Sequence, residues 1–283
     1  MPLGFGEPQT LTLRFADSEA DLAAKLLDPY GSGVRGVLVL GSGFSSALAH
    51  LPTIMELSFS ELPGLGESKV PGHAGRVRLV EYEGEKLLTF EGRPHFYEDG
   101  DMRRSAYPAR LAAALNSNFL LLCSAVGGLA PEATTGAWVF VDDHINLMGK
   151  NPLLGVVTNE GPPFVDLTET YRGDLYNEIS SKLSGLTLER GVLAAFSGPT
   201  YETPAEVEMA RLAGASIVGM SIVPEAVWAR FLEMDVVAFG RVVNPAAGLS
   251  GAKLNHEDVV REGAMAGTEA VAVLCAALDS LLK

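Results

Sequence analysis

The sequence predicts an α/β protein with a mixed or largely parallel central sheet. Short, Val-rich apolar runs alternate with helical patterns along the chain. With 283 residues, 47% of them hydrophobic, the chain can bury one large core. No internal repeat, low-complexity tract or linker divides it. We therefore expect residues 1–283 to form a single domain.

Charge and cysteine content restrict the partners and the compartment. The formal net charge of −14 argues against a nucleic-acid or anionic-membrane surface, because binding to polyanions needs clustered Lys and Arg. Cys123 and Cys275 lie in apolar runs, as expected of core thiols in a reducing compartment. The N-terminus has no basic region followed by an apolar stretch, and no long uncharged apolar run occurs. These features predict a soluble cytoplasmic protein.

The first strand is expected at Val34–Leu40 and leads into Gly41-Ser42-Gly43, followed by a helix from about Ser45 to Leu51. A glycine turn that opens a helix can bind an anion through backbone N–H groups, and Ser42 adds a hydroxyl. The same residues are equally compatible with a tight turn between strand and helix that binds no ligand. The dinucleotide fingerprint and the P-loop both need residues that are absent here.

A hairpin is expected next, formed by Val77–Tyr82 and Lys86–Phe90. His73 precedes it between glycines, where a lone His is commonly exposed or capping. If residues 92–98 are extended, a period of two places Arg93, His95 and Tyr97 on one face. Arg and His together can clamp a phosphate or carboxylate, whereas the alternative is a solvated face.

The middle of the chain predicts a helix at Ser105–Leu115 and a buried strand at Phe119–Cys123. The small residues 124–128 after that strand predict a turn whose N–H groups could approach an anion. A further strand at Trp138–Val141 precedes Asp142-Asp143-His144. Neighbouring strand residues point to opposite faces, and no other His or Cys cluster supplies ligands, so no metal site is expected.

Residues 149–165, rich in Gly, Pro and Asn, predict a long loop of a kind that is commonly functional or at an interface.

Two polar turns then bracket one amphipathic helix. A strand at Leu193–Phe196 leads to Gly198–Pro204, where Thr203 is the expected N-cap and Glu206 completes a capping box. Glu202 therefore lies just outside the helix. A short buried strand at Ser216–Gly219 leads into Met220-Ser221.

The last elements are a helix from Pro224 to about Leu232, a buried strand at Val236–Val243, and one long final helix. Pro245 ends the strand, so Asn244 lies at its exit with an amide that can donate and accept. Asn255 is the expected N-cap of the final helix, which runs to about Leu282 and carries an apolar stripe.

Nine short motifs in order resemble the trimeric purine nucleoside phosphorylases and cover about residues 35–258. They are Gly41-Ser42-Gly43, Gly72-His73-Ala74-Gly75, Gly92-Arg93-x-His95-x-Tyr97-Glu98, Ala125-x-Gly127-Gly128-Leu129, Asp143-His144-Ile145-Asn146-Leu147, Asn151-Pro152-Leu153, Gly198-Pro199-x-Tyr201-Glu202-Thr203, Gly219-Met220-Ser221-x-Val223-Pro224-Glu225 and Asn255-His256-Glu257. The resemblance implies one domain around a mixed, partly barrel-like sheet flanked by helices, and a homotrimer. It also implies a pentosyltransferase that cleaves purine nucleosides reversibly with phosphate, for purine salvage.

The resemblance assigns roles by matching position. Phosphate would be held by Ser42, His73, Arg93, His95, Ala125 through its backbone N–H, and Ser221. The nucleoside would be held by Tyr97, Tyr201, Glu202, Met220, Asn244 and His256. No metal and no cofactor are expected, with inorganic phosphate as co-substrate.

The chemistry fits these residue types. Cleaving an N-glycosidic bond builds positive charge on the sugar and negative charge on the base. Phosphate can stabilise the positive charge on the sugar, and an amide hydrogen donated by Asn244 to N7 can stabilise the negative charge on the base. An ionised Glu202 suits the N1–H of inosine or guanosine and would face the bare N1 of adenine unfavourably. Asn244, Glu202 and His95 are the expected catalytic set, with Glu202 as a binder and not a nucleophile.

Three positions depart from the family pattern. Ser124 stands where Asn is common, and Pro94 replaces a larger residue between Arg93 and His95. The aromatic residue that family members lend to a neighbouring subunit has Phe164 as its nearest match.

Other functions remain open at this stage. A 5′-methylthioadenosine phosphorylase would typically carry Asp at 244 and Thr at 221. A nucleoside hydrolase would need an aspartate cluster near the N-terminus, and a serine esterase a Gly-x-Ser-x-Gly turn; both are absent. A non-catalytic nucleoside-binding module would bind without turnover.

Overall fold

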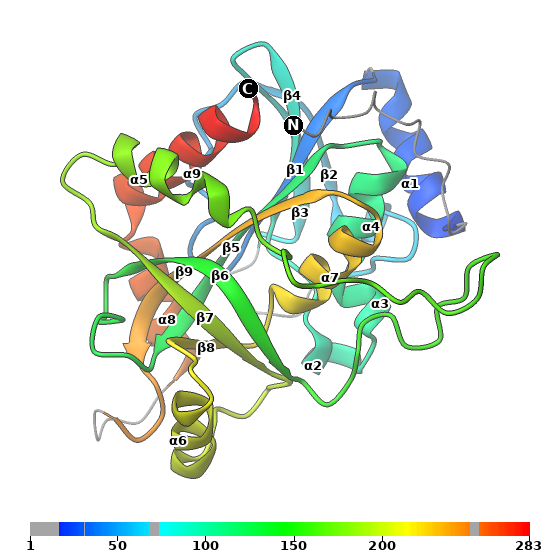
Figure 1. The fold of residues 1–283 in the computed structure, drawn as a ribbon. Coiled ribbons are helices and arrows are strands. Elements are labelled where there is room, and N and C mark those ends of the chain that lie inside the picture. The colour runs from blue at the N-terminus through cyan, green and yellow to red at the C-terminus, as the bar shows by residue number, and fades with distance from the viewer. Residues whose placement is uncertain (1–16, 31, 68–73, 250–254) are drawn as a thin grey trace, which may run out of the picture.

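The computed structural model describes residues 17–30, 32–67, 74–249 and 255–283. Its strands form one mixed sheet (Figure 1). In chain order they are β1 (Val34–Leu40), β2 (Thr53–Ser58), β3 (Arg76–Tyr82), β4 (Glu85–Glu91), β5 (Phe119–Gly128), β6 (Trp138–Leu147), β7 (Leu188–Phe196), β8 (Ile217–Gly219) and β9 (Asp235–Pro245).

The sheet order is β2-β3-β4-β1-β5-β8-β7-β6-β9, and β5 also pairs with β9. That additional pairing closes β5, β8, β7, β6 and β9 into a ring, while β2, β3, β4 and β1 extend from it as an open sheet. The predicted mixed, partly barrel-like sheet is confirmed.

Helices cover both faces of the sheet (Figure 1). One core includes side chains from α1 (Ser18–Leu27), α4 (Tyr107–Ala114) and α7 (Val223–Phe231), and the other includes side chains from α5 (Tyr176–Lys182) and α9 (Gly267–Leu281). Alternate residues of β1 enter the two cores, because successive strand side chains point to opposite faces. An unbroken apolar run is what a strand covered on both faces requires.

Four further helices complete the described part of the chain. They are α2 (Phe96–Asp99), α3 (Met102–Ser105), α6 (Pro204–Leu212) and α8 (His256–Ala264), with 3₁₀ turns at Asp28–Tyr30, Phe59–Glu61 and Gly173–Leu175. α6 stands out from the body of the molecule beside β8 (Figure 1).

The helix predicted at residues 45–51 is wrong, because this segment is a series of tight turns. The N–H groups of Phe44, Ala47 and Leu51 each donate to the carbonyl three residues earlier. So short a segment gains little from helix formation. Gly43 has φ of 87°, and a Cβ there would lie 2.5 Å from the backbone of Gly263 in α8. The glycine turn therefore serves close packing against α8 and does not begin a helix.

The turn predicted at residues 124–128 is also wrong, since β5 continues to Gly128 and pairs with both β9 and β8. A Cβ at Gly128 would lie 1.8 Å from the carbonyl oxygen of Ala133, so the small residue allows close backbone approach. β6 likewise continues past its predicted end at Val141, through a register shift, to Leu147.

Two predicted helices are each divided. The segment predicted as Ser105–Leu115 is α3 and α4, which meet at Ala106 with Pro108 in the first turn of α4. The final helix is α8 and α9, bent by 69°. Among the described residues no single helix has the length and apolar composition to cross a bilayer; only this bent pair meets that test when its two halves are taken together.

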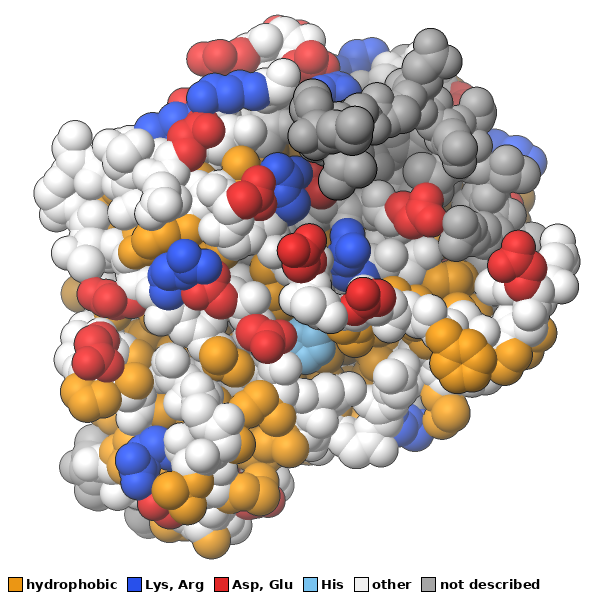
Figure 2. Space-filling view, in the orientation of Figure 1, with side chains coloured by type: hydrophobic (Ala, Val, Ile, Leu, Met, Phe, Trp, Pro, Cys, Tyr) orange, Lys and Arg blue, Asp and Glu red, His pale blue; other side chains and the backbone are white. Residues whose placement is uncertain are grey.

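On the face that Figure 2 shows, Lys and Arg side chains lie interspersed with Asp and Glu, and the lower part around α6 is richer in hydrophobic side chains. The exposed apolar side chains of α6 include Met209 and Leu212.

Candidate active site

A cavity of about 520 Å³ lies where several strands of the sheet end. Its walls come from the segments after β1 and β8, the second half of β5, the end of β9, α2, the loop before α6, and α8. Ligand sites of open α/β sheets commonly lie outside the carboxyl ends of strands. Most of the residues that the sequence analysis selected meet in this one cavity.

One end of the cavity, which we name the anion end after the ligand predicted for it, is lined by hydroxyls, an imidazole and backbone. Its residues are Ser42, His95, Ser124, Ala125 and Ser221. The Gly41 N–H donates to the Cys123 carbonyl at 2.9 Å, which ties the turn that carries Ser42 to β5. His95 is the N-cap of α2, and its N–H donates to the Glu98 carboxylate at 2.6 Å.

Ser221 is held by a strained turn. Ile222, fully buried, has φ of 73° and ψ of −53°, and the Val223 N–H donates to the Ser221 carbonyl at 2.9 Å. This is a γ-turn of the rare, strained hand, in a residue whose branched Cβ makes a positive φ costly. Strain of this kind persists only where the surroundings enforce it, and here it fixes the backbone that carries Ser221.

Arg93 lies behind the anion end and not on its wall. Its side chain is fully buried, and one guanidinium nitrogen donates to the carbonyls of Val39 (3.0 Å) and Cys123 (2.7 Å). A second nitrogen lies 3.2 Å from the Glu225 carboxylate, which is also buried. Burial raises the pKa of Glu225, and the Arg93 charge opposes that shift. The role of Arg93 in phosphate binding remains a prediction.

The predicted extended segment with Arg93, His95 and Tyr97 on one face is wrong. α2 begins directly after His95, so the strand period of two does not apply. The rings of His95 and Tyr97 stack instead, with centroids 4.7 Å apart, while Arg93 is turned into the core.

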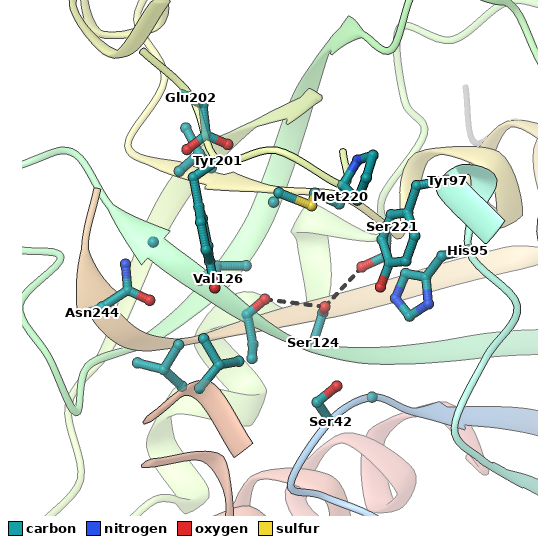
Figure 3. A pocket seen from close by; sticks show the side chains of 18 of the residues that line it. Ser42, His95, Tyr97, Ser124, Val126, Tyr201, Glu202, Met220, Ser221 and Asn244 are labelled. Atoms are coloured by element: carbon teal, nitrogen blue, oxygen red, sulfur yellow. Dashed lines mark hydrogen bonds between the residues drawn. The ribbon is translucent and has the colours of Figure 1, made fainter. Parts of the chain in front are cut away.

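Tyr97 and Met220 also line the cavity: Tyr97 lies beside His95, and Met220 lies between Tyr97 and Tyr201 (Figure 3). Gly198 packs against both: a Cβ there would lie 2.6 Å from the Met220 sulfur and 2.7 Å from the Tyr97 ring. Gly198 also has φ of 65°, so a side chain at this position would be both strained and obstructed.

The opposite end, which we name the base end after the ligand predicted for it, carries Tyr201, Glu202 and Asn244 (Figure 3). The predicted capping box of α6 is confirmed: the Thr203 hydroxyl accepts from the Glu206 N–H at 3.2 Å, and the Glu206 carboxylate accepts from the Thr203 N–H at 2.7 Å. Glu202 is therefore left outside the helix with its side chain largely buried, and burial raises its pKa. Asn244 donates one amide hydrogen to the Pro245 carbonyl at 2.7 Å.

Two predicted residues cannot be placed. His73 lies outside the described residues, and so does the side chain of His256. The predicted N-cap before His256 is confirmed, since the Asn255 side chain accepts from the Asp258 N–H at 2.8 Å.

The sequence analysis gave no role to Val259 or Glu225. Val259 lines the cavity one turn after His256, and helical spacing could have indicated it. The pairing of Glu225 with Arg93 is a long-range contact that no local pattern shows.

The acidic run after the predicted strand at 138–141 has structural partners. Asp142 forms two hydrogen bonds with Arg190, at 2.6 and 2.7 Å, and Asp143 accepts the N–H of His144. No group of His, Cys, Asp and Glu in the described part of the chain is arranged to hold a metal.

Comparisons with known proteins agree with this architecture. The family model of the phosphorylase superfamily matches residues 37–279. The chain is 38% identical to the purine nucleoside phosphorylase of Mycobacterium leprae, covering 90% of this chain and 93% of that protein. It is also 38% identical to the Cellulomonas sp. purine nucleoside phosphorylase, covering 95% and 94%. A crystal structure of Schistosoma mansoni purine nucleoside phosphorylase in complex with adenosine aligns with a TM-score of 0.81 at 28% identity, over 93% of this chain and 95% of that one.

The family match and the ring of strands place the chain in the phosphorylase superfamily. Within it, the chain belongs to the purine nucleoside phosphorylases, which are pentosyltransferases.

Proposed function

We propose that this enzyme cleaves 6-oxopurine ribonucleosides and deoxyribonucleosides, such as inosine and guanosine, with inorganic phosphate. The products are the free base and (deoxy)ribose 1-phosphate, and the reaction is reversible. The observation that carries the proposal is one cavity with hydroxyl, imidazole and backbone groups at one end and Glu202 and Asn244 at the other. No further cofactor enters this scheme.

Phosphate is assigned to the anion end. The hydrogen-bond donors are two serine hydroxyls, an imidazole whose charge depends on pH, and one backbone N–H; they belong to Ser42, Ser221, His95 and Ala125. Arg93 adds a positive charge from its buried position next to this end of the cavity. His73 completes this set in the proposal. A phosphate oxygen forms a bond to C1′ of the sugar while the bond from C1′ to N9 breaks and its electrons pass to the purine.

The purine is assigned to the base end. An Asn244 amide hydrogen donated to N7 stabilises the negative charge that the leaving base acquires. Ionised Glu202 accepts hydrogen bonds from N1–H of a 6-oxopurine and from the exocyclic amine of guanine. Adenine has a bare N1 lone pair, which faces the carboxylate unfavourably, and such mismatches are worth orders of magnitude.

The sugar is assigned to the middle of the cavity. Tyr97 and Met220 lie against it, Tyr201 packs on the base, and His256 contacts the 5′-hydroxyl. The positions of Tyr97, Met220 and Tyr201 on the cavity wall support these roles.

The proposed assembly is a homotrimer, and the proposed compartment is the cytoplasm, where both cysteines would stay free thiols. Phe164 is 96% exposed, and Leu154 and Val157 on the same loop are 73% and 65% exposed. Large apolar side chains so exposed are typical of interfaces. Light scattering should give three times the chain mass, and a monomer would overturn this part.

The test of the reaction is base release from inosine, guanosine, adenosine and 5′-methylthioadenosine, each with and without phosphate, followed by chromatography. We expect phosphate-dependent release of hypoxanthine and guanine, with little adenine. Adenosine belongs in this series because the Schistosoma enzyme was crystallised with it. Release without phosphate would indicate a hydrolase, and preference for methylthioadenosine would overturn the roles given to Glu202 and Asn244.

A further inference from the structure

Ser124 is a lining residue of the anion end to which the proposed reaction gives no role. Its hydroxyl oxygen lies 2.8 Å from that of Ser221, and both side chains are buried (Figure 3). The Ser124 hydroxyl also donates to the carbonyl of Ala125 at 3.3 Å. It therefore contacts two of the residues that are assigned to phosphate.

The number of hydroxyl hydrogens decides which hydrogen bonds Ser124 and Ser221 can donate. Each serine hydroxyl has one hydrogen to donate and lone pairs that accept. While Ser124 donates to the Ala125 carbonyl, the hydrogen between the two serines must come from Ser221. Ser221 then has no hydrogen left for an anion.

An anion in the cavity changes that balance. Ser221 can turn its hydrogen to the anion if Ser124 turns its own hydrogen from the Ala125 carbonyl to the Ser221 oxygen. The bond given up is 3.3 Å long and the one kept is 2.8 Å, so the exchange loses the weaker contact. A hydroxyl that accepts a hydrogen bond is also polarised into a better donor.

We propose that Ser124 is a positioning residue for phosphate, which acts by donating its hydroxyl hydrogen to Ser221 and so directing the Ser221 hydrogen to the anion. The inference rests on the proposed function, because it takes phosphate as the anion at this end. Ser124 itself need not touch the phosphate.

The test is phosphate affinity in a double-mutant cycle of Ser124→Ala and Ser221→Ala. Affinity is measured by calorimetry with inorganic phosphate alone, and KM for phosphate and for inosine are measured beside it. One hydrogen bond is worth a roughly three- to tenfold change, so Ser124→Ala should weaken phosphate by about that factor and leave KM for inosine within about twofold. Because Ser124 acts through Ser221, the double variant should bind phosphate about as weakly as Ser221→Ala alone.

The matched control is Ser117→Ala, which removes another buried serine hydroxyl, bonded at 2.9 Å to the Val34 carbonyl and away from the cavity. Its phosphate affinity should equal that of the wild type. Unchanged affinity in Ser124→Ala would overturn the inference. So would additive losses in the double variant, because they would mean that Ser124 binds phosphate independently. If the wild type neither binds nor requires phosphate, the proposed function fails first, which is a different result from either.

Discussion

The two ends of the cavity are built differently. The anion end comes from β1, β5 and the segment after β8, and its lining groups are hydroxyls, an imidazole and backbone, with the Arg93–Glu225 pair behind them. The base end depends on single side chains: a carboxylate before α6 and an amide at the exit of β9. An anion can be held by several interchangeable donors, whereas a base is distinguished by one group at one atom. Substitutions should therefore have graded effects at the anion end and steep effects at the base end.

The steepest effect is expected for Asn244→Ala. This change removes the amide that we propose stabilises the leaving base, and loss of one such donor commonly lowers turnover by about 10²–10³-fold. Phosphate affinity should stay within about twofold, because the anion end is intact. Single-turnover rates and phosphate calorimetry on the same variant would check both. Near-normal turnover would remove Asn244 from catalysis and break the contrast.

The next effect concerns the charged pair behind the anion end. Removing one member of a buried ion pair costs roughly 3–5 kcal/mol of folding free energy, whereas replacing both can be neutral. Arg93→Met with Glu225→Gln should therefore unfold at a higher temperature than Arg93→Met alone, although both variants lose the hydrogen bonds of Arg93 to the Val39 and Cys123 carbonyls.

The paired variant also separates stability from binding. If the positive charge of Arg93 reaches the phosphate, KM for phosphate should rise at least about tenfold in the double variant, a loss of roughly 1.4 kcal/mol. Normal phosphate dependence in that variant would show that Arg93 only supports the fold of the anion end.

How far the sequence predicts this molecule can be seen at these residues. The capping box at Thr203 and Glu206 is local chemistry within four positions, so the box and the position of Glu202 just outside α6 follow from the sequence, whereas the burial of Glu202 does not. The ring closure of β5 with β9 and the pairing of Arg93 with Glu225 join segments far apart, and no local period encodes them. The prediction of an extended segment at residues 92–98 was wrong for a related reason. The period of two applies only to a strand, and α2 begins at Phe96.

At the base end of the cavity, the protonation of Glu202 should make the rate depend on pH. Burial raises the pKa of Glu202 above its ordinary value, while the N–H and hydroxyl of Thr203 lower that of exposed Glu206. As pH falls through the raised pKa, Glu202 gains a proton and can no longer act as the ionised acceptor that we propose for N1–H of the purine. The acid limb of kcat/KM for inosine should therefore lie above pH 4.5.

Protonation of Glu202 should lower activity without lowering the free energy of unfolding. Loss of activity through Glu202 can therefore be distinguished from acid unfolding. A carboxyl whose pKa is raised by folding binds its proton more tightly in the folded state, so protonating Glu202 does not favour unfolding. Glu202→Gln should remove the acid limb at a lower overall rate, and Glu206→Gln, the control, should keep it. An acid limb that survives in Glu202→Gln would assign it to another group.

The smallest effect is expected at the capping box that holds the base end. Thr203→Ala removes one N-cap bond of α6, which typically costs about 1 kcal/mol, or roughly 2–4 °C of unfolding temperature in a chain of this size. Because Glu202 directly precedes the cap, KM for inosine should rise by up to about threefold while KM for phosphate stays constant. An equal loss for both substrates would mean that the two ends are mechanically coupled through α6, and the contrast between a graded end and a steep end would not hold.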